Sequence, residues 1–211
     1  MLNGIQCLGH STIKISKSTK VIYIDPFKIK EKLNDADIIF VTHSHYDHFS
    51  PDDIEKVKNE NTIIVVTEDL YSSAQEVGFN ANNIITVKPY EEFEAIGIQV
   101  STIPAYNTNK KFHPKENNWL GYILTLDGVK YYIAGDTDIN EDNRKVKCHV
   151  AFVPVGGTYT MTATEAAELI NEIKPKIAVP IHYGSIVGTR QDAIDFQNRL
   201  DSDIQGEILI K

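Results

Sequence analysis

The feature that most constrains this chain is a run of metal-capable side chains, His43-Ser44-His45-Tyr46-Asp47-His48. Residues 36–42, just before it, form an apolar run typical of a buried strand. Ser50 and Pro51, with the acids behind them, are typical of a helix start. We therefore expect the cluster on a loop between a strand and a helix, where a rigid scaffold can aim its side chains.

The spacing within this cluster suits two metal ions. His43 and His45 are two residues apart, so in an extended chain they point the same way and can bind one ion. The chain then turns, which re-aims Asp47 and His48 toward a second ion. Imidazole nitrogens and carboxylate oxygens are ligands of zinc and its divalent neighbours. The alternative, a surface cluster of histidines, does not account for this position between a strand and a capped helix.

Composition limits the possible partners. With 211 residues, 42% hydrophobic and 24% charged, the chain has the profile of a soluble globular protein. Its net charge of -8 argues against nucleic acid or an anionic membrane as the main partner, so we expect a small-molecule substrate. We see neither a leader sequence nor an apolar segment long enough to span a membrane, and expect a cytoplasmic protein.

The order of predicted elements indicates two mixed sheets. Short β-branched runs over 5–16 and 19–24 predict an antiparallel opening, and helices then alternate with strands up to residue 87. The second half again begins with strands, including a hairpin over 119–134 that turns at Asp127-Gly128. The remaining predicted elements are strands at 149–153, 177–181 and 207–210 and helices after Thr162 and near 191–200. Two sheets packed together with helices outside, in a single domain over 1–211, account for this order.

Ionisable residues follow several of the predicted buried strands. Asp25, the His43–His48 cluster, Asp136 and His182 each come directly after such a strand. One aspartate after a strand is a common turn residue. Together with the histidine cluster, however, these residues predict one site built from distant segments at the strand ends.

At these positions the sequence resembles the metallo-β-lactamase superfamily. The match runs from Gly9-His10-Ser11 through the cluster and Gly135-Asp136 to Ile181-His182-Tyr183-Gly184, essentially the whole chain. It is most similar to the small, stand-alone prokaryotic metal-dependent hydrolases, the branch with ascorbate-phosphate-lactonase-like and N-acyl-phosphatidylethanolamine phospholipase D-like proteins. The resemblance implies a four-layer αββα sandwich, of the α+β class, with metals at one edge.

The resemblance also implies a role for each site residue. His43 and His45 would bind a first metal ion, and a second would be bound by Asp47, His48 and His182. Asp136 would bridge the two ions, and Asp25 would orient the cluster. The expected cofactor is one or two zinc ions, with manganese or iron as alternatives.

One position departs from the family pattern. Related proteins carry a histidine after the middle strand, where this chain has Asn107, and asparagine is a poor zinc ligand. Two interpretations follow: His113, six residues further on, replaces the missing ligand, or His113 is an exposed loop residue and the site holds one metal. Asn107 itself remains a candidate contact to substrate or metal.

Two further residues are candidates for the site. His10, beside Gly9 between two strands, can act as an acid or contact a phosphate, or it can be a loop residue bonded to backbone. Thr160 belongs to a loop before a predicted helix start, a position that suits an anion, so it is a candidate contact to substrate or metal.

The expected function is metal-dependent hydrolysis of a phosphodiester, lactone or other ester in a small anionic substrate. Asp47 or Asp136 would orient the attacking water or take its proton, and His10 or His113 would protonate the leaving group. Two alternatives remain: mononuclear-iron sulfur or oxygen chemistry on the same fold, and a non-catalytic metal-binding regulatory module, which Asn107 favours.

Overall fold

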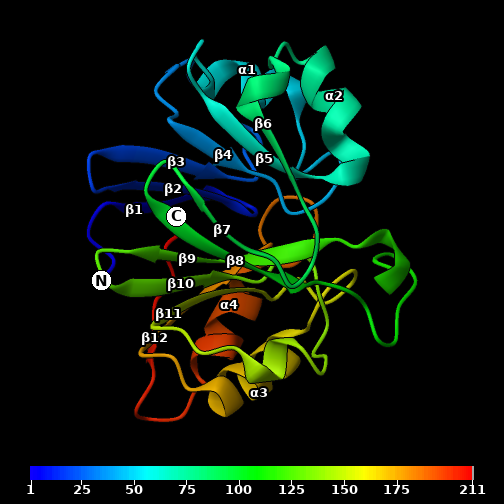
Figure 1. Ribbon diagram of the computed structural model, residues 1–211. Helices are drawn as coiled ribbons and strands as arrows, with labels where there is room; N and C mark the ends of the chain where they lie inside the picture. Colours follow the sequence, from blue (N-terminus) through cyan, green and yellow to red (C-terminus); the bar gives the residue numbers. More distant parts are fainter. Residues whose placement is uncertain (211) are drawn as a thin grey trace.

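The computed structural model describes residues 1–210 and contains two β-sheets stacked face to face, with helices on both outer faces (Figure 1). The first sheet has the strand order β1-β2-β3-β4-β5-β6. Its strands are β1 (Ile5–Gly9), β2 (Thr12–Lys17), β3 (Lys20–Ile24), β4 (Ile38–Phe40), β5 (Ile63–Thr67) and β6 (Ile84–Val87). The sheet is antiparallel from β1 to β3 and parallel from β3 to β6.

The second sheet has the order β13-β12-β11-β10-β9-β8-β7. Its strands are β7 (Glu92–Ala95), β8 (Ile98–Pro104), β9 (Leu120–Leu126), β10 (Val129–Ile133), β11 (Val150–Pro154), β12 (Ile177–Ile181) and β13 (Gln205–Gly206). Here the antiparallel part runs from β7 to β10 and the parallel part from β10 to β13. Both sheets are therefore mixed, as the sequence predicts.

Two pairs of helices cover the outer faces. The α-helices are α1 (Pro51–Val57), α2 (Tyr71–Glu76), α3 (Ala163–Ile173) and α4 (Arg190–Gln197). Short 3-10 helices join other elements: η1 (Glu68–Leu70), η2 (Ala81–Asn83), η3 (Lys115–Asn117) and η4 (Asn143–Lys145). Figure 1 shows α1 and α2 on the outer side of the first sheet and α3 and α4 on that of the second. The predicted αββα arrangement is confirmed.

Buried apolar residues fill each of the three interfaces between layers. One cluster lies between the sheets, one between the first sheet and its helices, and one between the second sheet and its helices. Strands such as β4, Ile38–Phe40, are buried on both faces, which explains their continuous apolar sequence. Such strands tolerate no charged side chain, so polar residues of the inner strands collect at their ends.

Local signals in the sequence explain the hairpin and α3. Asp127 and Gly128 both have positive φ angles, 51° and 74°, as a tight hairpin turn requires, and Leu126 pairs with Val129. The capping box of α3 forms as predicted between Thr162 and Glu165. Both elements begin and end within about one residue of where propensity places them.

Two predicted boundaries are wrong. The final strand predicted at 207–210 is replaced by the two-residue β13, because the edge pairs with β12 only as far as Glu207, whose N–H donates to Ala178 O. One of the helices predicted before residue 87 begins as the 3-10 helix η1 and becomes α-helical at Tyr71. Strand β7 was not predicted, because Glu92-Phe93-Glu94-Ala95 is largely exposed and has a weak apolar pattern.

Hydrogen bonds join the two sheets at one edge. His182 N–H donates to His10 O at 2.8 Å, and Leu120 N–H donates to Thr42 O at 3.2 Å. The buried hydroxyl of Tyr122 donates to Val41 O at 2.7 Å. Because each bond reaches a residue within or beside the predicted site, this edge fixes how the two sheets present their loops.

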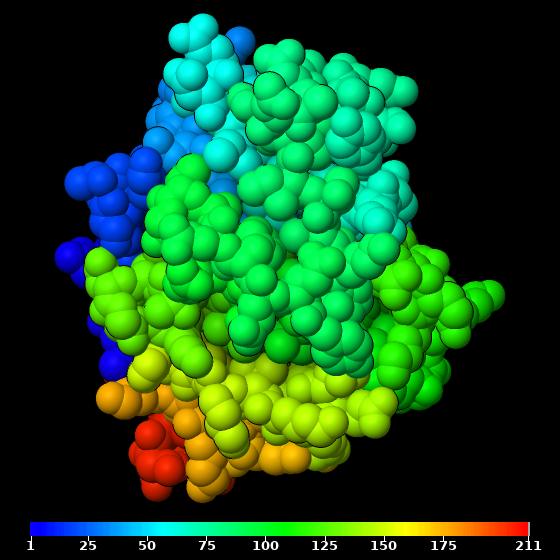
Figure 2. All heavy atoms as spheres, in the orientation of Figure 1, coloured from blue at the N-terminus to red at the C-terminus, as the bar shows by residue number. Residues whose placement is uncertain are grey.

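No helix among the described residues is long and apolar enough to cross a membrane. The segment after β8, green in Figures 1 and 2, projects from the body of the molecule. That segment carries Asn107 and His113.

The Tyr122 hydroxyl gives a first testable prediction. Tyr122→Phe leaves the buried carbonyl of Val41 without this donor, which should lower the free energy of unfolding by about 1–3 kcal/mol. Urea denaturation measures the change. Tyr90→Phe, which removes a hydroxyl from a 66% exposed side chain, is the control and should change stability by less than about 0.5 kcal/mol. Equal stability of the two variants would contradict the prediction.

Candidate metal centre

The predicted site residues converge at the edge where the sheets are joined. His10 lies in the turn between β1 and β2, and the cluster from His43 to His48 follows β4. Asp136 follows β10, His182 follows β12, and His113 comes from the long segment after β8. Of the seven histidines in the chain, His149 alone lies elsewhere, where its Nδ1 accepts from Lys130 N–H.

The first group of potential ligands contains His43, His45 and His113, whose nitrogens all lie within 4.8 Å of one another. His43 Nε2 is 3.1 Å from His45 Nδ1. The ring centroid of the buried Trp119 lies 4.9 Å from that of His43 and 4.7 Å from that of His45. His113 is 1% exposed, so the interpretation of an exposed loop residue is wrong.

Asn107 holds His113 in this position. Its Oδ1 accepts from the backbone N–H of His113 at 3.0 Å and lies 3.1 Å from His113 Nδ1. The backbone N–H of Asn107 donates in return to His113 O at 2.8 Å, and its Nδ2 donates to Tyr159 O at 2.9 Å. With Nδ1 occupied, His113 presents Nε2 to the site. Asn107 therefore contacts the potential ligand His113 through both its backbone and its side chain.

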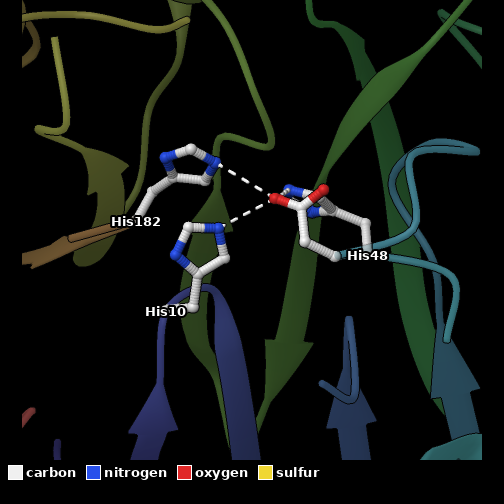
Figure 3. A group of neighbouring side chains, drawn as sticks. His10, His48 and His182 are labelled. Carbon is white, nitrogen blue, oxygen red and sulfur yellow. Dashed lines mark hydrogen bonds and ion pairs between the residues drawn. The ribbon is translucent and has the colours of Figure 1, made fainter. Parts of the chain in front are cut away.

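The second group contains His10, Asp47, His48 and His182, again with one atom of each within 4.8 Å of the others. Figure 3 shows the rings of His10 and His182 pointing to one carboxylate oxygen, with His48 beside it. His10 Nε2 is 2.9 Å from Asp47 Oδ2, and His182 Nε2 is 3.7 Å from the same oxygen. Sequence reasoning placed His10 outside this group, whereas in the structure its buried ring lies against the Asp47 carboxylate.

Asp136 lies between the two groups. One of its oxygens is 3.2 Å from His113 Nε2 and 3.0 Å from His182 Nε2, and the other is 3.3 Å from His48 Nε2. The preceding Gly135 has a φ of 66°, and a Cβ there would lie 2.9 Å from Leu120 O. Glycine thus permits the tight turn that aims Asp136 between the groups.

Asp25 and Thr42 orient the rings from behind. Asp25 Oδ2 is 2.7 Å from His48 Nδ1, and Asp25 Oδ1 accepts from Thr42 N–H at 2.8 Å. The Thr42 hydroxyl donates to Asp25 at 2.8 Å and lies 3.0 Å from His43 Nδ1. These contacts occupy both Nδ1 atoms and leave the Nε2 atoms for the site, an arrangement typical of metal-binding histidines. Sequence reasoning missed Thr42, although it directly precedes His43.

Burial and neighbouring charges shift the pKa values of the histidines and aspartates in the site. Burial lowers the pKa of His43 well below its usual value, so its neutral, metal-binding form is preferred. Burial opposes ionisation of Asp136, but His182 and His48 outweigh it and hold the pKa of Asp136 well below the usual range. Burial likewise opposes protonation of His48, yet Asp136 and Asp25 raise the pKa of His48. The chain thus keeps a carboxylate buried among histidines.

Several buried polar atoms at this edge have no hydrogen-bond partner within the described chain. They include His48 Nε2, His113 Nε2, His182 Nε2 and Asp136 Oδ1. Leaving one such atom unpartnered costs about 1–3 kcal/mol, so a cluster of them calls for a ligand. Imidazole nitrogens and a carboxylate in this arrangement fit divalent metal ions.

Three of the site residues have a left-handed backbone. His10, Asp25 and His182 have φ angles of 49°, 45° and 58°. This conformation costs a non-glycine residue about 1–3 kcal/mol, and such residues cluster at functional sites. The strain is held in place by the seam between the sheets, which includes the bond from His182 N–H to His10 O.

The remaining candidates lie outside the ligand groups. Thr160 is fully buried and is not among the described residues that line the cavity over the metal-ligand groups. Lys110, on the segment that carries His113, donates to Asp138 at 2.6 Å. The cavity has a volume of about 220 Å³ and is lined by His45, Tyr46, Asp47, Phe112, His113, Asp136, Tyr159, His182 and Ile186.

Comparison with known proteins agrees with this geometry. The profile of the beta-lactamase superfamily domain matches residues 4–182. The chain belongs to the metallo-β-lactamase superfamily. It is 31% identical over 220 residues to the UPF0173 metal-dependent hydrolase of Thermococcus onnurineus, covering 98% of this chain and 96% of that protein. The predicted family membership is therefore confirmed, and the chain is a metal-dependent hydrolase.

Solved structures share the fold. A candidate metal-dependent hydrolase from Parabacteroides distasonis has a TM-score of 0.82 and 31% identity, with 98% of this chain and 93% of that chain covered. A metallo hydrolase from Ignicoccus hospitalis has a TM-score of 0.79 at 22% identity, with 98% and 94% covered, which shows the fold alone. The two-sheet superfamily architecture is thus shared with solved metallo-hydrolase structures.

The contacts of Asn107 yield a second prediction. Asn107→Leu removes the acceptor that fixes His113, and loss of such an outer partner should weaken zinc binding at one site by about 10–100-fold. Zinc stoichiometry and competition with a chromogenic chelator measure the effect. Asn107→Asp, which keeps the acceptor, should recover most of the affinity, and Asn109→Leu on the exposed part of the same segment is the control. Unchanged zinc affinity in Asn107→Leu would contradict the assignment.

Proposed function

We propose that this hydrolase cleaves a phosphodiester, lactone or other ester bond of a small molecule, using two zinc ions. The observation that carries the proposal is the position of Asp136 between two complete ligand groups. His43, His45 and His113 would bind the first ion, and Asp47, His48 and His182 the second. With His113 in the first group, Asn107 no longer argues for a single metal or for a regulatory module.

The protein's own residues contribute to the reaction by holding a carboxylate where it can accept a proton. When bound, a divalent metal supplies a Lewis acid and lowers the pKa of a water molecule to about 7. Asp47 lines the cavity, and its hydrogen bond with His10, together with the His182 ring 3.7 Å away, outweighs its burial and lowers its pKa, so it stays an ionised acceptor. We assign Asp47 to orienting the attacking water and accepting its proton. His10 fixes the Asp47 carboxylate and is thereby a positioning residue.

The residues that line the cavity limit where an anionic substrate can carry its negative charge. Among the described lining residues there is no lysine or arginine. Positive charge for an anion would come from the metal ions alone. The anionic part of the substrate is therefore the scissile group itself, either a phosphodiester or the developing oxyanion of an ester.

The free thiols of Cys7 and Cys148 suit a cytoplasmic location, which we include in the proposal.

Iron-based oxygen or sulfur chemistry on the same ligand set is the second candidate. It is favoured by the histidine and carboxylate donors, which also suit iron. Metal analysis of the purified protein separates these candidates.

Removal of metal should destabilise the protein. At a free zinc concentration of about 100 times the Kd, binding adds about 2.7 kcal/mol to stability. For a chain of this size that corresponds to a melting temperature roughly 5–10 °C higher than with chelator. Differential scanning calorimetry measures the shift. Asp136→Asn should reduce the shift and His149→Ala should retain it; equal shifts in both would show that zinc binds elsewhere.

Hydrolysis itself can be tested with chromogenic substrates. Zinc-loaded protein should hydrolyse at least one of p-nitrophenyl butyrate, bis(p-nitrophenyl) phosphate and an aliphatic γ-lactone, because these represent the proposed bonds. Chelation should abolish turnover and zinc should restore it. Asp25→Asn should lower kcat/KM by about 10–100-fold by loosening His48. Bound iron with oxygen uptake and no hydrolysis would favour the second candidate and contradict the first.

A further inference from the structure

Apolar side chains gather at the mouth of the cavity over the metal ligands. Four of its lining residues, Tyr46, Phe112, Tyr159 and Ile186, are not potential ligands, and together they are termed the collar. Tyr46 is 66% exposed and Phe112 is 39% exposed. Large apolar side chains left exposed beside a polar centre mark a surface that binds something.

The collar is fixed relative to the ligands by the chain itself. Tyr46 lies between the ligands His45 and Asp47 in sequence, and Phe112 directly precedes His113. The rings of Phe112 and Tyr159 meet edge to face, with centroids 4.7 Å apart. The bond from Asn107 Nδ2 to Tyr159 O ties these two loops together. An apolar group between them would therefore lie next to a bond held at the ligands.

Charged groups near the cavity do not serve a second anion. Lys110 donates to Asp138 at 2.6 Å and Lys28 donates to Ser185 at 2.8 Å, so neither ammonium is free to turn inward without breaking a contact. The ionisable lining residues are histidines and the acids Asp47 and Asp136. The metal ions would neutralise these carboxylates, and no lysine or arginine among the described lining residues remains to pair with a second anion away from the ligands.

We propose that the collar binds an uncharged apolar group, a short acyl chain or a single aromatic ring, attached directly to the scissile ester. This rests on the proposed hydrolase function and specifies its substrate class. The size follows from the cavity, whose volume of about 220 Å³ lies below the roughly 300–1,000 Å³ of pockets for drug-sized ligands. Tyr46 and Phe112 are the specificity-determining residues, since each lines the cavity and leaves a large part of its ring exposed to a ligand.

The test measures binding of three phosphonates to zinc-loaded protein by isothermal titration calorimetry, without any need for turnover. Methylphosphonate lacks the ring, phenylphosphonate carries it, and 4-carboxyphenylphosphonate adds one distal charge. Phenylphosphonate should bind about tenfold or more tightly than either of the others, the discrimination expected of an apolar pocket. The variants Tyr46→Ala and Phe112→Ala should lose this preference while keeping their zinc content. Tyr90→Ala, with the same 66% exposure but outside the cavity, is the matched control and should keep it.

Each result is decisive for the collar. Equal affinity for methyl- and phenylphosphonate, tighter binding of the carboxylated compound, no phosphonate binding at all, or a preference that survives in both variants would overturn the proposal. Absence of ester hydrolysis with the phenylphosphonate preference intact would instead overturn the proposed reaction. The two failures are therefore distinguishable.

Discussion

The contact between the two sheets at one edge is the constraint on which the site depends. Potential ligands from the first sheet, His10 and the cluster after β4, face Asp136 and His182 from the second. An apolar core between the sheets and the bond from His182 N–H to His10 O keep these loops opposed. Burial of the apolar core stabilises the sandwich at about 25 cal/mol per Å² of apolar surface, and this offsets the cost of burying charge and strained backbone at the edge. The site is thus supported by packing that lies far from it.

The buried charges at this edge are arranged for a ligand and not for stability alone. Asp136 is held ionised among histidines, although a protein with a hydrophobic residue of similar volume in place of a buried charge is often at least as stable. Asp25 and Asn107 each fix a ring from its Nδ1 side, so that Nε2 of His48 and His113 faces the centre. Outer contacts of this kind are needed wherever imidazole must point along one direction. The polar network therefore explains why these residues are buried at all.

The sequence was most informative where chemistry is concentrated in a short stretch or follows a strand. The cluster at His43–His48, together with Asp25, Asp136 and His182, could be assigned to one edge because parallel strands place their ends together. The fold could be derived from the same alternation of strands and helices. The role of His113 could not, because a loop of this length has no periodicity from which to infer where its side chains point. The edge strand β13 could not be predicted either, because a strand of two residues is too short to show an alternation of apolar and polar residues. From the sequence, Asn107 indicated a missing ligand, because the fold of this loop, which brings His113 against Asn107, could not be predicted.

Because His113 lies on a long loop, the two groups of potential ligands should differ in how fast they exchange a metal ion with solvent. Of the ligands proposed for the second ion, Asp47 and His48 lie on the loop after β4 and His182 directly follows β12, and all three are buried where the two sheets are joined. His113 is also buried, but it comes from the long segment between β8 and β9, where it is hydrogen-bonded to Asn107 of the same segment. Local opening of such a segment requires far less free energy than opening of core strands. On the proposed ligand assignment, we therefore expect the ion bound with His113 to exchange with solvent faster than the other ion, and to be the last of the two to load.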